Sequence, residues 1–258
     1  MNEDLRWAAF KSKAQDVAIS EPDVLAVDWD LRHPLFAEDF PIAGSLTLDY
    51  ATHLKNSAQA VSSTLRPYLS IHWRLESVPL ASLQGCAQSL VDKLTDILSS
   101  SRTGNFSGEQ DIKTVWIATD YPYPVVPTSN LNDGRRRSTT FKTISPEHVE
   151  AMNTFIEAFR AGGKLQGLQL TDLNGGLVVL EDDFERKGLN SEDMGFFEDE
   201  GVMGIFDKMV AMNAELFVSG AKGCSRTSSF TKQIVEARKV RAEEGDEHLR
   251  NIIELFGL

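Results

Sequence analysis

Cysteine is scarce in this chain of 258 residues, which has only Cys86 and Cys224. Two cysteines cannot build the multiple-disulfide framework of small secreted domains, nor a zinc site made of four cysteines. We therefore expect a fold that disulfides do not hold together. With 41% apolar residues, a chain of this length can bury roughly 70% of its unfolded surface, enough for one large α/β domain or a domain with an appendage.

Basic charge is also in deficit, because 38 acidic side chains outnumber 26 basic ones and leave a formal net charge of -12. Such a chain offers no basic footprint for a phosphate backbone, so we expect no nucleic-acid partner. The basic cluster Arg135-Arg136-Arg137 follows Asn-Asp-Gly and is interpreted as a solvated loop rather than a ligand patch.

Long apolar runs are missing as well. None approaches the ~20 residues that span a bilayer, and the start at Met1-Asn2-Glu3-Asp4 has neither the basic nor the apolar region of a signal peptide. We expect no membrane segment and no targeting signal in this chain. No repeat of roughly 20–50 residues occurs, which excludes solenoids and propellers.

The sequence alternates between helical and strand-like apolar patterns. Helical spacing is found at 47–66, 83–98, 145–161, 205–212, 228–241 and 249–256, and short apolar runs typical of buried strands occur at 68–73, 114–118, 177–180 and 215–219. This alternation predicts an α/β fold with a doubly wound, Rossmann-like parallel sheet that binds ligands at the carboxyl ends of its strands. We expect this domain to cover 67–258 and an N-terminal remnant, a linker with one helix, to cover 1–66.

A hydroxyl-rich helix start follows the last predicted strand. Beyond a loop with Gly223 and Arg226, the residues Ser228, Ser229, Phe230 and Thr231 open a helix. Unpaired amide groups, hydroxyl donors and the positive end of the helix dipole suit a phosphate or diphosphate. The alternative is an ordinary serine or threonine N-cap.

Arg74 stands at the carboxyl end of the first predicted strand, where a doubly wound fold binds its ligands. Its planar guanidinium suits a diphosphate, and His72 projects from the same face of the strand. The alternative places Arg74 in a surface salt bridge with Glu76 and His72 in a satisfied core position.

Two carboxylates are further candidates. Asp207, in a helix before the hydroxyl-rich start, could accept hydrogen bonds from the N1–H and amino group of a guanine, and its alternative role is a solvated helix position. Asp120 ends the second predicted strand, and its alternative role is to cap the turn that follows.

Taken together, these segments resemble the GDP-fucose protein O-fucosyltransferase family. The resemblance rests on 68–74 with its His72-Trp73-Arg74, on 115–120, and on Phe206-Asp207 leading through 216–218 to 228–231 and Arg238. It covers roughly 66–241. The pairing of the first and last motifs is its most specific part.

The resemblance implies a fold and a chemistry. The sheet would correspond to the C-terminal lobe of a GT-B-type glycosyltransferase that transfers fucose from GDP-fucose to a serine, threonine or sugar hydroxyl of a protein or glycan acceptor. The transfer would invert the anomeric carbon and need no metal and no cofactor besides the donor. The family also suggests the secretory pathway.

The resemblance also implies roles for individual residues. Arg74 would neutralise the β-phosphate and be the catalytic residue, with His72 beside the nucleotide. Asp207 would read the guanine, and Ser228, Ser229, Phe230 and Thr231 would cradle the phosphates and nucleoside. Asp120 and Glu76 are secondary candidates next to this site.

The chain departs from the family at its start. The amino-terminal Rossmann-like lobe with its glycine-rich, asparagine-containing loop is not found in 1–66, so a catalytically inactive GDP-sugar-binding module with an interaction role is the alternative function. The triplet Asp28-Trp29-Asp30 is similar to the metal-binding acid pair of another glycosyltransferase class, but it precedes every predicted nucleotide-binding strand and is interpreted as a chance surface motif. A nicotinamide oxidoreductase is disfavoured because Gly162, Gly163 and Gly167 lack the spacing of the dinucleotide fingerprint.

Overall fold

A computed structural model describes the residues 50–103, 111–122, 124–125, 141, 143–187, 199–226 and 228–258. Its compact units are Met1–Ala51 and Thr52–Leu258, and the fold below is that of the second unit. Asp28-Trp29-Asp30 and Arg135-Arg136-Arg137, together with residues 1–49 of the predicted N-terminal remnant, lie outside the described residues. Within the described ranges, no helix combines the length and apolar character needed to cross a membrane.

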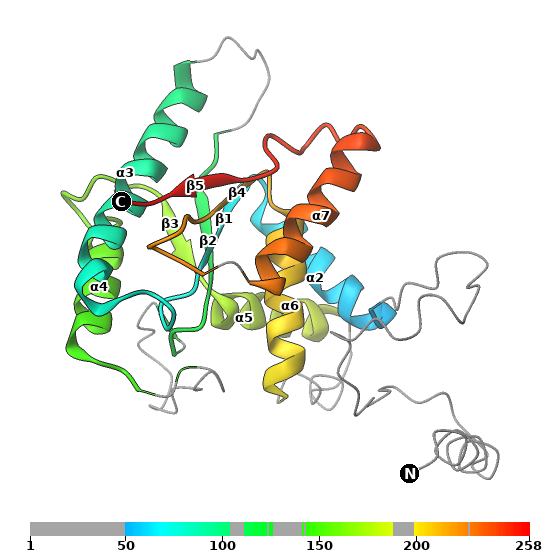
Figure 1. The fold of residues 1–258 in the computed structure, drawn as a ribbon. Coiled ribbons are helices and arrows are strands. Elements are labelled where there is room, and N and C mark those ends of the chain that lie inside the picture. The colour runs from blue at the N-terminus through cyan, green and yellow to red at the C-terminus, as the bar shows by residue number, and fades with distance from the viewer. Residues whose placement is uncertain are drawn as a thin grey trace, which may run out of the picture. The chain divides into compact units, whose positions relative to one another are not determined.

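Helices and strands alternate along the second unit. The helices are α2 (Thr52–Leu65), α3 (Leu80–Thr103), α4 (Pro146–Glu157), α5 (Leu173–Lys187), α6 (Glu200–Asn213) and α7 (Ser229–Glu243), and the strands are β1 (Tyr68–Trp73), β2 (Thr114–Thr119), β3 (Gln169–Thr171), β4 (Leu216–Gly220) and β5 (Glu254–Phe256). The five strands form one parallel sheet in the order β3-β2-β1-β4-β5 (Figure 1). The predicted α/β class with a Rossmann-like parallel sheet is confirmed.

Helices cover both faces of the sheet. Figure 1 shows α3 and α4 on one side and α2, α5, α6 and α7 on the other. Strand β1 alternates accordingly: Leu69, Ile71 and Trp73 join the large apolar core that includes α3 and α4, while His72 projects to the opposite face. Every residue of β1 and β2 is buried, as expected for central strands of a parallel sheet.

The strand predicted at 177–180 is wrong. These residues lie within α5, and the third strand is the short β3 that precedes it. The buried carboxylate of Asp172 starts the helix by accepting hydrogen bonds from the amides of Asn174 at 3.0 Å and Gly175 at 3.3 Å. The apolar run 177–180 covers one turn of the helix, so its side chains point in different directions. Leu180 is fully buried, whereas Val178 is 51% exposed. Periodicity alone cannot separate a short apolar run in a strand from one in a helix.

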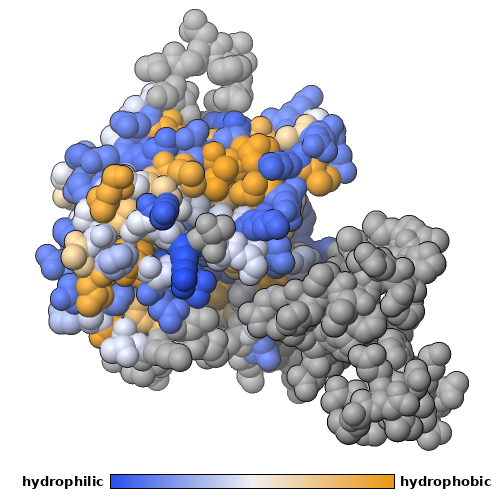
Figure 2. Space-filling view, in the orientation of Figure 1, coloured by the Kyte–Doolittle hydropathy of each residue, from blue (hydrophilic) through white to orange (hydrophobic). Residues whose placement is uncertain are grey.

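The helix predicted at 249–256 is also wrong. This segment is irregular until β5, which pairs with β4 at the edge of the sheet. Asn251 holds it extended, because its side-chain amide accepts from the Phe217 amide at 2.9 Å and donates to the Phe217 carbonyl at 3.2 Å. The edge position leaves Leu255 52% exposed, and Figure 2 shows apolar surface along this side of the molecule.

The expectation that disulfides do not hold the fold is wrong. Cys86 in α3 and Cys224 in the loop between β4 and α7 form a disulfide with their Cα atoms 5.3 Å apart. It closes a loop of 138 residues between segments whose proximity the sequence does not reveal. The two cysteines are too few for a framework, yet they connect one helix to the loop that follows a central strand.

Candidate functional site

The two central strands β1 and β4 send the chain to opposite faces of the sheet. After β1 the chain continues into α3, and after β4 it continues into α7 on the other side (Figure 1). In a doubly wound sheet, ligands bind outside the carboxyl ends of the strands at this switch in direction. The residues that follow the two strands, Arg74 after β1 and 221–231 after β4, include most of the predicted site.

His72 joins β1 to the first turn of α7. Its ring nitrogen Nδ1 lies 2.8 Å from the hydroxyl oxygen Oγ1 of Thr231, and its ring stacks on Phe230 with centroids 4.5 Å apart. Burial, reinforced by the charge of Arg74, lowers the pKa of His72 to about 4. The imidazole is therefore neutral near pH 7 and fixes the start of α7 against the end of the sheet.

Ser228 caps the start of α7. Its hydroxyl oxygen accepts a hydrogen bond from the Thr231 amide at 3.1 Å and lies 3.0 Å from the Thr231 hydroxyl. This is the N-cap geometry that was the alternative for these hydroxyls. The Ser228 side chain engages the amide of Thr231 and not those of Ser229 and Phe230, so the cap leaves donors of the first turn for an anion.

The guanidinium of Arg74 lies near two carboxylates. Its nitrogens are 3.5 Å from Glu76 Oε2 and 3.8 Å from Asp120 Oδ2, and the side chain is one-third exposed. The predicted contact with Glu76 is therefore present. Both separations exceed the roughly 2.7–3.2 Å of an ordinary hydrogen bond, so the Arg74 donors are not committed to these carboxylates.

Asp120 holds the turn after β1. Its two carboxylate oxygens accept hydrogen bonds from the amides of Leu75 at 2.8 Å and Glu76 at 3.2 Å, so the turn that it caps is the one after β1 rather than the turn after its own strand β2. Burial is the largest influence on this group and raises the pKa of Asp120 to about 6, against these hydrogen bonds and the charge of Arg74. Asp120 thus positions the backbone that carries Arg74.

Asp207 lies in the interior rather than at the edge of the sheet. Its side chain on α6 is 5% exposed, and its Oδ1 accepts a hydrogen bond from the indole N–H of Trp116 at 2.6 Å. The alternative of a solvated helix position is wrong. A guanine read by Asp207 would have to share the carboxylate with Trp116, and that role stays a prediction.

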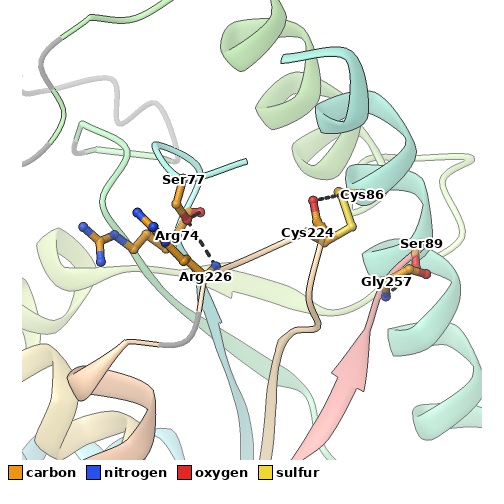
Figure 3. The surroundings of a disulfide bond; sticks show 8 residues. Arg74, Ser77, Cys86, Ser89, Cys224, Arg226 and Gly257 are labelled. Carbon is orange, nitrogen blue, oxygen red and sulfur yellow. Dashed lines mark hydrogen bonds between the residues drawn. A yellow bond between two sulfur atoms is a disulfide. The ribbon is translucent and has the colours of Figure 1, made fainter. Parts of the chain in front are cut away.

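Sequence reasoning missed Ser77 and assigned no role to Arg226. The Ser77 hydroxyl donates to the Arg74 carbonyl at 3.2 Å and accepts from the Arg226 amide at 3.2 Å (Figure 3). It therefore links the backbone after β1 to the backbone after β4. A lone serine between a strand and a helix carries no sequence signal for such a contact.

Metal ligands do not gather in the described part of the chain, where no group of three or more His, Cys, Asp or Glu side chains could hold an ion. Comparison with protein-family models gives no match, and neither curated proteins nor solved structures match the chain significantly. The functional argument therefore depends on the fold and on the arrangement of these residues.

Proposed function

We propose that this chain is a glycosyltransferase similar to the protein O-fucosyltransferases, whose sheet binds GDP-fucose at the carboxyl ends of β1 and β4. The observation that supports it is the 2.8 Å contact of His72 with Thr231, because it brings the strand end that carries Arg74 to the opening amides of α7. The sheet would then be the C-terminal, donor-binding lobe of a GT-B enzyme.

The proposed reaction follows from the charge that develops when GDP leaves. Breaking the bond between the anomeric carbon of fucose and the β-phosphate oxygen leaves positive charge on the sugar and negative charge on the diphosphate. Arg74 and the amides at the start of α7 would stabilise that negative charge, and in comparable sites one such donor contributes ~2.7–4 kcal/mol. A serine, threonine or sugar hydroxyl on the opposite face would attack with inversion and without a metal, and its proton would pass to solvent water or to a phosphate oxygen of the departing GDP.

A GDP-sugar-binding module without turnover is the second candidate. It is favoured by the engagement of Asp120, since each of its carboxylate oxygens already accepts a backbone amide and the side chain is held in the turn after β1. Glu76, the other carboxylate beside Arg74, lies 3.5 Å from that arginine in the same turn.

Calorimetry of the full chain with GDP and GDP-fucose tests the proposal. Replacing Arg74 by alanine should weaken both ligands by about 10–100-fold, the worth of a charge-assisted hydrogen bond to phosphate. Arg160→Ala is the matched control, because Arg160 is an exposed arginine paired with Glu157 after α4. Equal GDP affinity in wild type and Arg74→Ala would reject the proposed diphosphate contact.

An assay for fucose release and fucose transfer then separates the two candidates. Donor hydrolysis or transfer by the wild-type chain, lost in Arg74→Ala, supports the enzyme. Tight GDP-fucose binding with neither activity supports the binding module.

A further inference from the structure

We propose that Arg226, in the loop between β4 and α7, is a second guanidinium of the same anion site and binds the diphosphate together with Arg74. The inference rests on the proposed function, because it assumes that a nucleoside diphosphate occupies the end of the sheet. It adds a binding residue that neither the predicted motifs nor the resemblance supplies.

The first observation is the link between the two arginines. Ser77 accepts a hydrogen bond from the Arg226 amide and donates one to the Arg74 carbonyl, each at 3.2 Å. A hydroxyl has one donor and two acceptor positions, so a single serine satisfies both partners at once. Figure 3 shows both arginines gathered around Ser77, with their side chains extending away from the disulfide.

The second observation is that the loop backbone is held in place over residues 221–225, directly before Arg226. The amides of Cys224 and Ser225 both donate to the Ala221 carbonyl, at 3.0 Å and 2.9 Å, and form a tight turn. Cys224 is also bonded to Cys86 of α3. A backbone held in this way loses little freedom when the side chain binds a ligand, which lowers the entropic cost of binding.

The third observation concerns charge. Arg226 is exposed, and of the arginines whose side chains are described it alone has no guanidinium partner among the described residues. Arg66, Arg160 and Arg241 form ion pairs with carboxylates in the same chain, whose formal net charge is -12. In so acidic a protein, we expect the Arg226 guanidinium, which lies in a segment linked to Arg74 through Ser77, to bind an anionic ligand.

Two guanidiniums define the class of ligand. Each planar fork can donate two parallel hydrogen bonds to one phosphoryl group, so two forks match a diphosphate better than a monophosphate. Arg226 should therefore contribute to GDP and to inorganic pyrophosphate, and much less to GMP.

The test is calorimetry of the full chain with GDP, GMP and inorganic pyrophosphate at one fixed salt concentration. Arg226→Ala should weaken GDP and pyrophosphate at least tenfold and GMP less than threefold, while Arg226→Lys should recover part of the loss. Lys222→Ala is the matched control, because it removes another exposed cation from the same loop. We expect Lys222→Ala to change the affinity for GDP and pyrophosphate less than threefold.

Several results would overturn the inference or the proposed function separately. GDP binding that is unchanged in Arg226→Ala, or weakened equally in Lys222→Ala, overturns the role of Arg226 and leaves the proposed function standing. Pyrophosphate binding that needs Arg226, with no preference for GDP over other nucleotides, supports the anion site and rejects the GDP-sugar donor. A wild-type chain that binds neither GDP nor pyrophosphate overturns both.

Discussion

The ring of His72 lies 2.8 Å from the hydroxyl of Thr231, although 159 positions separate the two residues in the chain. One stands near the end of a central strand, and the other in the first turn of the helix that follows a neighbouring strand. This contact fixes the opening amides of α7 beside the segment that carries Arg74. Its strength should control both local stability and the affinity for a diphosphate.

Thr231→Val tests that contact with little change in shape. The variant leaves the buried Nδ1 of His72 without its hydroxyl partner, which should cost about 1–3 kcal/mol of unfolding free energy. Because the first turn of α7 would loosen, GDP affinity should fall several-fold. Urea titration and calorimetry measure the two effects. Thr154→Val is the control, since it removes an exposed hydroxyl that bonds Gln84 at 2.9 Å, and it should change both by little.

Two buried groups near this contact should give opposite pH dependences. Burial and the charge of Arg74 lower the pKa of His72 from 6.5 to about 4, so between these values the unfolded chain binds a proton that the folded chain refuses. Stability from His72 is therefore lost as pH falls through this window, by about 3 kcal/mol at most. Burial raises the pKa of Asp120 from 3.8 to about 6, so its contribution is lost as pH rises through nearly the same window.

Single variants should separate these two contributions. Relative to wild type, the unfolding free energy of Asp120→Asn should increase between about pH 4 and pH 6.5, and that of His72→Gln should decrease. Urea titrations of both variants and the wild type at the two pH values measure the differences, in which the other carboxylates cancel. The same sign of change in both variants would contradict the assignment.

Much of this arrangement could be predicted from local sequence patterns. The strands β1, β2 and β4 were predicted because buried parallel strands are continuous apolar runs, and α4 because Ser145 and Pro146 mark a helix start. Doubly wound topology then brings Arg74 and the start of α7 to one end of the sheet. Helix α5 shows the limit of such patterns, since its apolar residues 177–180 are compatible with a strand as well as with a helix.

The contacts that complete the site depend on tertiary proximity and carry no local signal. Ser77 is an ordinary linker residue until the fold sets it beside Arg226. The disulfide joins Cys86 to Cys224 across 138 residues, and no spacing rule for two cysteines predicts such a bond. The hydrogen bond from Trp116 to Asp207 joins residues 91 positions apart and likewise carries no local signal.

Breaking the disulfide should affect both the fold and the loop that bears Arg226. Removing a disulfide that closes so long a loop should cost about 2–5 kcal/mol of unfolding free energy. Urea titrations of wild type with and without reductant, and of Cys86→Ser, measure this cost. GDP affinity of the folded Cys86→Ser variant should also fall, because Cys224 no longer anchors the turn before Arg226.

The control for this prediction is the double variant Cys86→Ala with Cys224→Ala. Its stability should not respond to reductant, which separates loss of the bond from any other effect of the reagent. A wild-type protein that contains two free thiols after denaturation without reductant would contradict the bond itself.

Arg238 should be among the most sensitive positions in the fold, although it lies away from the candidate site. The side chain is fully buried, and its guanidinium donates to the carbonyls of Ala214 at 2.6 Å, Glu215 at 3.1 Å, Asn251 at 2.7 Å and Ile252 at 3.0 Å. It thereby ties α7 to the end of α6 and to the extended segment before β5. Burial lowers the pKa of Arg238 to about 10, which leaves it charged at neutral pH.

Arg238→Lys tests whether the planar fork or only the charge is needed. A lysine has one ammonium group in place of the fork and cannot reach all of these carbonyls, so several buried acceptors would lose their donors and a buried charge would be poorly paired. The expected loss is about 3–5 kcal/mol of unfolding free energy, measured by urea titration. Hydrogen exchange should show the Ala221 amide, which donates to Phe256 in β5 at 2.7 Å, opening first. Lys239→Ala, an exposed neighbour on α7, should leave both measurements unchanged, and an Arg238→Lys protein as stable as this control would show that charge alone suffices.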